Sequence, residues 1–194
     1  MQQLALVVVD VQNDFCPGGA LAVNRGDTII PRINKVVRAF EGKGLPIFFT
    51  RDWHPTDHVS FRSRGGPWPP HCVMGTPGAE FHPALKRPEG SIVVSKGSLP
   101  NSEAYSGFQG TDLATRLREL GVREVVIGGL ATEYCVKETA LDAIKGGFEA
   151  SILEDCIMGV EVHKGDSIRA LQAMVKAGAK ETDSLHTVRV ISGA

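Results

Sequence analysis

The sequence has little of what would mark a nucleic-acid-binding or membrane protein. Its 21 lysines and arginines are offset by 22 aspartates and glutamates, which leaves a formal net charge of −1. A nucleic-acid surface needs clustered positive charge in excess, so no binding to DNA or RNA is expected. The longest early apolar run, residues 4–9, is too short to span a bilayer and follows no basic segment of the kind that begins a signal peptide. The sequence therefore predicts a soluble cytoplasmic protein with no membrane partner.

Cysteine is also scarce, and none of the four forms a C-x-x-C pair: Cys16, Cys72, Cys135 and Cys156. In a chain that is not secreted, thiols are more often buried, catalytic or metal-bound than paired in disulfides. The missing C-x-x-C pair argues against a zinc ribbon. It also argues against a cysteine redox protein, because that function needs a partner thiol close to the reactive one.

Strand-like and helix-like segments alternate along the chain, with no internal repeat or linker between them. Residues 4–9 form a continuous apolar run, which is typical of a strand buried on both faces. Further strands are predicted at residues 45–50, 91–95, 124–127, 149–153 and 187–191. This alternation favours an α/β protein with a parallel sheet and helices on both faces, formed as a single domain by residues 1–194.

Four helices are predicted between these strands. The first carries apolar residues at helical spacing over residues 29–40, with Asp27 or Thr28 as its N-cap and Pro31 in its first turn. The others begin after Thr111, near residues 132–134 and near residue 166. Residues 52–88 follow neither pattern and are rich in proline, glycine and histidine. A long irregular loop inside a compact domain is usually a functional one.

Ionisable side chains follow four consecutive predicted strands. Asp10 ends the first, Asp52 and His54 follow the second, Lys96 follows the third, and Cys135 opens the helix after the fourth. Ligands of open α/β sheets bind outside the carboxyl ends of the strands. We therefore expect these five side chains to gather at one edge of the sheet.

Cys135 is the candidate nucleophile of this group. Unpaired N–H groups at a helix N-terminus favour a thiolate and can hold an oxyanion. Asp10 could accept the thiol proton while Lys96 holds charge and orientation, which is a workable set for covalent catalysis. Each residue also has an ordinary interpretation, namely a small buried cysteine, a carboxylate that caps a loop and a solvated lysine.

Asp52 and His54 form a second group, because residues two apart on an extended chain face the same side. His71, from the long loop, is a third candidate ligand, and His58 lies close enough to reach the same site. One carboxylate and two imidazoles suit zinc, iron or manganese. The alternative is that these histidines lie on the surface of a proline-rich loop.

Aromatic side chains in loops suggest a pocket for a flat ring. Phe15, Trp68 and Tyr105 lie outside the predicted core elements. They could line an apolar cavity, although ordinary loop packing would explain them nearly as well.

Six short segments, in order from the first strand towards the fifth, contain all of these candidate site residues except His58. They are residues 8–15 (VVDVQNDF), 51–55 (RDWHP), 66–72 (GPWPPHC), 95–97 (SKG), 104–108 (AYSGF) and 129–136 (GLATEYCV). Together they closely resemble the nicotinamidases, which belong to the isochorismatase-like cysteine hydrolases. The resemblance covers most of the chain, including the irregular loop.

The resemblance implies a three-layer α/β/α fold around a six-stranded parallel sheet in the order 3-2-1-4-5-6, with a metal-binding insertion at about residues 52–88. It also implies specific site residues. These are Asp10, Lys96 and Cys135 as the catalytic triad; Ala131 and Cys135 as the oxyanion hole, after a cis peptide bond between Leu130 and Ala131; Phe15, Trp68, Tyr105 and Leu130 as substrate-binding residues; and Asp52, His54 and His71 as metal ligands, with His58 as a further candidate.

The activity implied is the metal-dependent hydrolysis of nicotinamide, and of pyrazinamide, to the acid and ammonia through a cysteine thioester, as in NAD salvage. The implied cofactor is one divalent ion, zinc first, with iron or manganese as alternatives, and relatives often form homo-oligomers. Other family members cleave N-carbamoyl amides, ureidoacrylate or isochorismate. Cys135 argues against the isochorismate group, and the complete ligand set with Trp68 favours a pyridine substrate over the carbamoyl compounds. A non-catalytic binding protein would not need all of these residues together.

Overall fold

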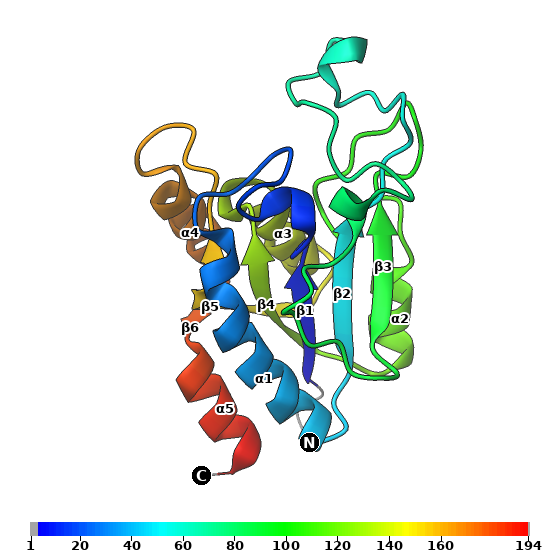
Figure 1. The fold of residues 1–194 in the computed structure, drawn as a ribbon. Coiled ribbons are helices and arrows are strands. Elements are labelled where there is room, and N and C mark those ends of the chain that lie inside the picture. Colours follow the sequence, from blue (N-terminus) through cyan, green and yellow to red (C-terminus); the bar gives the residue numbers. More distant parts are fainter. Residues whose placement is uncertain (1–3, 194) are drawn as a thin grey trace.

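The computed structural model describes residues 4–193 and has three layers, with a six-stranded parallel sheet between two layers of helices (Figure 1). The strands lie in the order β3-β2-β1-β4-β5-β6, which confirms the predicted topology. The strands are β1 (Leu4–Val9), β2 (Ile47–Asp52), β3 (Ile92–Lys96), β4 (Glu124–Leu130), β5 (Glu149–Met158) and β6 (Lys180–Thr182).

The central strand β1 separates two hydrophobic cores. Its side chains alternate between the two faces of the sheet, so that Leu6 and Val8 enter one core while Val7 and Val9 enter the other. Val9 pairs with Thr50 of β2, and also with Gly129 of β4. The carboxyl ends of these three strands are therefore level, and the residues that follow them meet at one edge.

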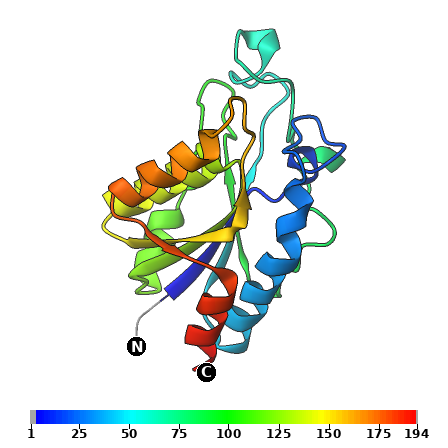
Figure 2. The same cartoon turned by 90° about the vertical axis from the view of Figure 1, so that its left-hand side faces the viewer.

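The helices divide between the two faces of the sheet, as the view along its edge shows (Figure 2). One face carries α1 and α5, and the other carries α2, α3 and α4. The helices are α1 (Ile30–Gly42), α2 (Leu113–Glu119), α3 (Lys137–Lys145), α4 (Asp166–Lys176) and α5 (Ser184–Ser192). Within residues 4–193 none of them is long and apolar enough to cross a bilayer.

The predicted N-cap of α1 is wrong. Asp27 and Thr28 lie in a 3₁₀ turn, η2 (Gly26–Ile29), and Ile29 takes the cap position without a side-chain hydrogen bond. The hydroxyl of Thr28 instead donates to the carbonyl of Arg25 at 2.7 Å. The 3₁₀ turn leads directly into α1, so the helix begins from an existing turn and does not depend on a capping side chain.

The strand predicted at residues 187–191 is also wrong, because this segment belongs to α5. The Asp183 side chain caps the helix by accepting the His186 N–H at 2.7 Å. The β-branched residues here also satisfy helical spacing: Thr187 is buried, and Val188 and Ile191 pack against the core. The last strand is instead the short β6, at the edge of the sheet.

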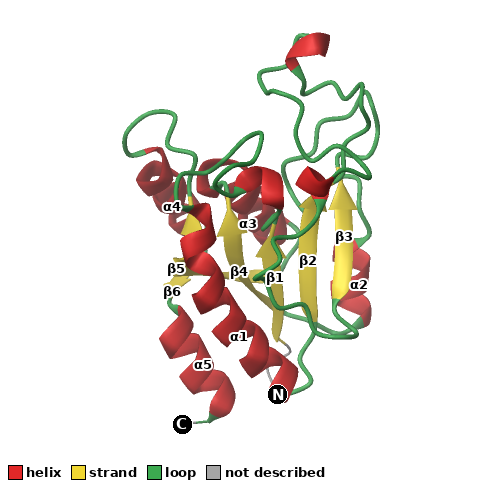
Figure 3. Ribbon diagram, viewed as in Figure 1, coloured by secondary structure: helices red, strands yellow, loops and turns green. Residues whose placement is uncertain are grey.

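The irregular segment predicted between the second and third strands is present as a long insertion. It leaves the carboxyl end of β2 and stands above the sheet edge, with only the short turns η3 (Arg62–Arg64) and η4 (Pro77–Ala79) as regular structure (Figure 3). Isolated β-bridges order it, pairing His54 with Val73 and Phe61 with Trp68. A third bridge, between Gln12 and Phe81, joins the insertion to the segment that follows β1.

Candidate active site and metal centre

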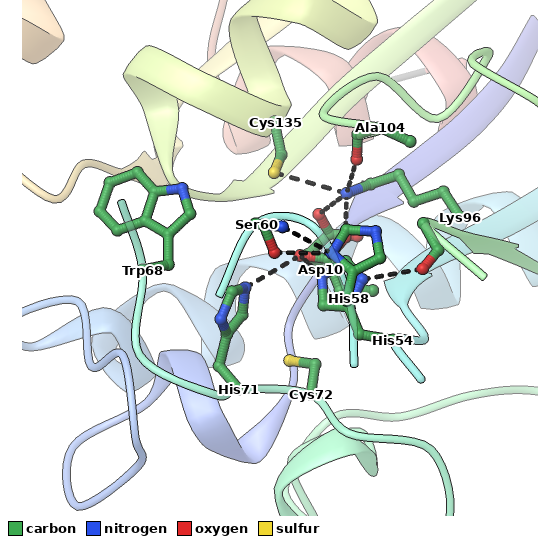
Figure 4. A network of polar contacts seen from close by, with 12 residues as sticks. Asp10, His54, His58, Ser60, Trp68, His71, Cys72, Lys96, Ala104 and Cys135 are labelled. Carbon is green, nitrogen blue, oxygen red and sulfur yellow. Dashed lines mark hydrogen bonds and ion pairs between the residues drawn. The ribbon is translucent and has the colours of Figure 1, made fainter. Parts of the chain in front are cut away.

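Asp10, Lys96 and Cys135 meet in a buried cluster at the carboxyl edge of the sheet (Figure 4). The Lys96 ammonium lies 2.9 Å from Asp10 Oδ2 and 3.5 Å from Cys135 Sγ. It also donates to the Ala104 carbonyl at 3.3 Å and to Asp52 Oδ1. One cation therefore contacts the candidate base, the candidate nucleophile and a predicted metal ligand.

Asp10 is held in an unusual backbone conformation. Its φ is +50°, in the left-handed region that non-glycine residues seldom adopt, and the hydroxyl of Thr50 donates to its Oδ1 at 2.6 Å. Such conformations persist where the surrounding structure enforces them, and they cluster at functional sites. Thr50 was not predicted from the sequence. Only the pairing of β1 with β2 places its hydroxyl beside this carboxylate.

Charge and burial set the protonation of the cluster. Burial raises the pKa of Asp10, against the opposing effect of Lys96. Burial alone would lower the pKa of Lys96, but the two carboxylates outweigh it and hold that pKa well above its usual value. Burial likewise would raise the pKa of Asp52, but Lys96 and His54 lower it below its usual range. The ion pairs thus favour the charged forms of Lys96 and Asp52, whereas burial favours the neutral form of Asp10.

Cys135 differs from the sequence expectation in its charge. Its side chain is only 3% exposed, and burial raises the pKa of the thiol well above its usual value although Lys96 opposes this shift. The predicted preference for thiolate is wrong for the resting site, because desolvation outweighs the local positive charge. Burial thus favours the neutral thiol, which would need a base beside it in order to react.

Cys135 lies on a turn of π-helix rather than at the start of an α-helix. This turn, η5 (Thr132–Val136), is closed by a hydrogen bond from the Val136 N–H to the carbonyl of Ala131 at 3.3 Å. Single π-turns are rare and often occur at functional sites. The predicted cis bond between Leu130 and Ala131 is wrong, since residues 4–193 contain no cis peptide. The chain reverses instead through a left-handed Ala131, with a φ of +62°.

Asp52, His54 and His71 converge on one point beside this cluster. The two Nε2 atoms lie 3.5 and 3.8 Å from Asp52 Oδ2, too long for hydrogen bonds, and all three candidate ligand atoms lie within 4.8 Å of one another. Backbone carbonyls fix the far side of each ring, because His54 Nδ1 donates to Gly97 and His71 Nδ1 donates to Pro69, both at 2.8 Å. The Nε2 lone pairs are left free, as in protein sites that bind divalent metals. The donor set therefore fits such an ion.

His58 does not join this group. Its Nδ1 pairs with the Ser60 hydroxyl at 2.7 Å and its Nε2 with the carbonyl of Ser102 at 3.0 Å. Its ring stacks on His54, with centroids 4.1 Å apart. In this arrangement His58 supports a ligand and offers no nitrogen to the metal.

A cavity opens above Cys135. The predicted aromatic residues line it, and Trp68 donates its indole N–H to the Tyr105 hydroxyl at 3.0 Å. The full lining is Phe15, Leu21, Asp52, Trp68, His71, Tyr105, Ala131, Tyr134, Cys135 and Val160. The side chain of Leu130 is fully buried in the core on the α1 face and is not part of this lining.

Three of the lining residues were not predicted. Tyr134 stands next to Cys135 in the sequence, and its ring meets that of Trp68 edge-on at 5.1 Å, so the motif around the cysteine could have revealed it. Leu21 and Val160 are single apolar residues in irregular segments, and no spacing pattern distinguishes them. The other three cysteines, Cys16, Cys72 and Cys156, are buried and unpaired.

Fold and site together define a class: a hydrolase of three-layer α/β/α fold, with a buried cysteine, aspartate and lysine at the carboxyl edge of a parallel sheet. The chain belongs to the isochorismatase family, whose domain model matches residues 4–184. It is similar to a nicotinamidase of Escherichia coli, with 38% identity over 92% of this chain and 94% of that protein.

Two solved structures agree with this assignment. A crystal structure described as pyrazinamidase of Pyrococcus horikoshii in complex with zinc shares 54% identity, has a TM-score of 0.90 and covers 93% of this chain and 99% of its own. The PnC1 protein from L. infantum, solved in complex with nicotinate, shares 34% identity and has a TM-score of 0.86. The match covers 95% of this chain and 94% of that chain.

Proposed function

We propose that the protein hydrolyses nicotinamide, and the related pyrazinamide, to the carboxylic acid and ammonia. One observation supports this most directly: a cavity lined by aromatic rings contains both the Cys135 thiol and two residues of the Asp-His-His group. A planar heteroaromatic amide matches such a site, because its ring can lie between the aromatic side chains with its amide carbon beside the sulfur. The similarity to a nicotinamidase and to a pyrazinamidase supports the same substrate class.

In the first half of the proposed reaction, Asp10 accepts the Cys135 proton and the sulfur bonds to the amide carbon. The N–H groups of Ala131 and Cys135 stabilise the negative charge on the carbonyl oxygen, and Lys96 keeps Asp10 and Cys135 in place. The C–N bond then breaks. The leaving nitrogen takes the proton from Asp10 and departs as ammonia, which leaves a thioester.

In the second half, water replaces ammonia. Asp10 accepts a proton from the water while the water oxygen bonds to the thioester carbon. The N–H groups of Ala131 and Cys135 again hold the oxyanion. The C–S bond breaks, the sulfur takes the proton that Asp10 holds, and the acid leaves as a carboxylate after losing its remaining proton to solvent. The raised pKa of Asp10 suits a group that must take up and release a proton in each half.

Asp52, His54 and His71 are the proposed ligands of one divalent ion, with zinc as the first choice because of their donor set and the zinc-bound relative. When bound, the ion would supply a positive charge and an open coordination position suited to a ring nitrogen. Homo-oligomer formation, a cytoplasmic location and a role in NAD salvage stay predictions.

The test is ammonia release from nicotinamide by the purified protein, as isolated, after chelation, and after adding back zinc, iron or manganese separately. Release that falls on chelation and recovers with metal is the expected result. Release from N-carbamoyl amides but not from nicotinamide would overturn the proposed substrate while leaving the cysteine chemistry in place.

A further inference from the structure

Glu133 is a buried carboxylate that neither the triad nor the metal group uses. It lies on the same π-turn as Cys135, two residues before it, and is only 9% exposed. Its two oxygens accept consecutive backbone N–H groups, from Val160 at 3.0 Å and from Glu161 at 2.5 Å. Hydrogen bonds to a buried carboxylate are among the stronger ones in proteins. Glu133 therefore joins the cysteine turn to the segment that follows β5.

The joined segment, residues 159–165, has other contacts as well, since Val160 packs against the core and the His163 N–H donates to Asp166 Oδ2 at 2.7 Å. Glu161 adopts a φ of +54°, in the left-handed region. Its carboxylate accepts the N–H groups of Gly165 and Ser167, both at 2.8 Å, and so connects the segment to the start of α4. The segment is thus held at one end by α4 and at the other by Glu133.

Gly159 shows how closely the two parts fit. A Cβ atom at this position would lie 2.5 Å from Glu133 Oε2 and 1.9 Å from the Ser167 hydroxyl oxygen. Neither contact is sterically allowed. A Cβ here would push the Ser167 hydroxyl and the Glu133 carboxylate aside, so glycine favours the close approach that lets the carboxylate receive both N–H groups.

Val160, whose N–H bonds to Glu133, also lines the substrate cavity with Trp68, Tyr105 and Cys135. We propose that Glu133 is a positioning residue: it fixes Val160 as one wall of the ring pocket and so sets the affinity for the aromatic amide, without taking part in bond making. The inference rests on the proposed function for its substrate, and on the structure alone for the link between Glu133 and the segment.

The test compares Glu133→Gln, Val160→Ala and the double variant in steady-state hydrolysis of nicotinamide. Glu133→Gln should raise KM roughly tenfold, the size expected for loss of a charge-assisted hydrogen bond, with kcat changed less than about threefold. Val160→Ala should raise KM in the same way, and the double variant should be no worse than the poorer single variant. Glu138→Gln, on the neighbouring helix, is the control, because its carboxylate forms an ion pair with the adjacent Lys137 at 3.2 Å and, among residues 4–193, with no other cation.

Amide hydrogen exchange gives a second readout that needs no activity. Glu133→Gln should speed exchange of the Val160 and Glu161 amides, whereas Glu138→Gln should not. If the wild type releases no ammonia from nicotinamide, the proposed function fails, and the exchange data still decide whether Glu133 holds the segment.

Several results would overturn the inference. An unchanged KM with a lowered kcat would mean that Glu133 acts on the nucleophile, and additive effects in the double variant would mean that it does not act through Val160. If Glu133→Gln does not fold, Gly159→Ala replaces it. That variant keeps the carboxylate but displaces the segment, and it should raise KM and speed exchange in the same way. No change in either measurement would overturn the inference.

Discussion

Replacing Lys96 by methionine tests the charge balance of the cluster. Lys96 is 1% exposed, and its ammonium contacts two carboxylates, Asp10 and Asp52. Methionine keeps much of the volume but leaves both carboxylates without a cation. Removing one partner of a buried ion pair costs about 3–5 kcal/mol of unfolding free energy, because an uncompensated charge stays buried. A loss of this size is expected near pH 7 in the metal-free protein.

The pH dependence makes the prediction specific. Lys96 opposes the rise in the pKa of Asp10 and lowers the pKa of Asp52. Without it, the pKa of Asp10 should rise further above the ordinary value of 3.8, and burial should raise the pKa of Asp52 from below that value. A group with a raised folded-state pKa stabilises the fold below its unfolded pKa, and this stability is lost as the pH rises through the folded-state value. The difference between variant and wild type should therefore be small near pH 4 and grow towards pH 8.

The assay is urea unfolding in the presence of a chelator across this pH range. Lys180→Met is the matched control, since Lys180 pairs with Glu149 at 2.5 Å on the surface, where both side chains are more than half exposed. Surface pairs contribute only about 0–1 kcal/mol. If Lys96→Met loses no more stability than the control, or if its loss does not grow with pH, the reasoning from buried charge is wrong.

Three further predictions concern the site. Cys135→Ala should lower turnover by about 10⁵–10⁶-fold, as loss of a nucleophile does, while calorimetry still detects nicotinamide binding; substantial residual activity would exclude the thioester. Thr50→Val removes the 2.6 Å hydrogen bond that lowers the pKa of Asp10, so the acid limb of the kcat/KM profile should move to higher pH; an unmoved limb would exclude Asp10 as the base. His71→Ala should weaken zinc binding by more than about 100-fold in a chelator competition, which is more than the loss of a residue outside the ligand set causes. His186→Ala, at an exposed histidine, should leave zinc affinity unchanged. Equal zinc affinities of the two variants would remove His71 from the ligand set.

The central strands β1, β2 and β4 could be predicted because almost all of their residues are buried, whereas the short, largely exposed β6 could not. Strand ends were less certain: β2 and β3 run on to Asp52 and Lys96, polar residues that are buried because they belong to the site. The prediction of a strand at the C-terminus was wrong for a different reason. Thr187, Val188 and Ile191 fit both a strand and a helix pattern, and the Asp183 cap with packing against α1 and the core favours the helix.

The candidate site could be predicted where each strand delivered one chemical group to a shared edge, as for Asp10, Lys96 and Cys135. Contacts between segments that are distant in the sequence could not be predicted. Neither Glu133 nor Val160 suggests a partner in the sequence, and only the folded chain brings the segment after β5 against the cysteine turn. Sequence order reveals which groups reach the edge, whereas their protonation and the pocket walls depend on three-dimensional burial.

The neutral state of the Cys135 sulfur has a consequence for chemical durability. Oxidants such as hydrogen peroxide react with thiolates far faster than with thiols. A sulfur that is 3% exposed and protonated at rest is a poor target, and Cys16, Cys72 and Cys156 are buried as well. The protein should therefore tolerate mild peroxide without a protecting reductant, and become sensitive only in a state in which Asp10 has taken the proton from the sulfur.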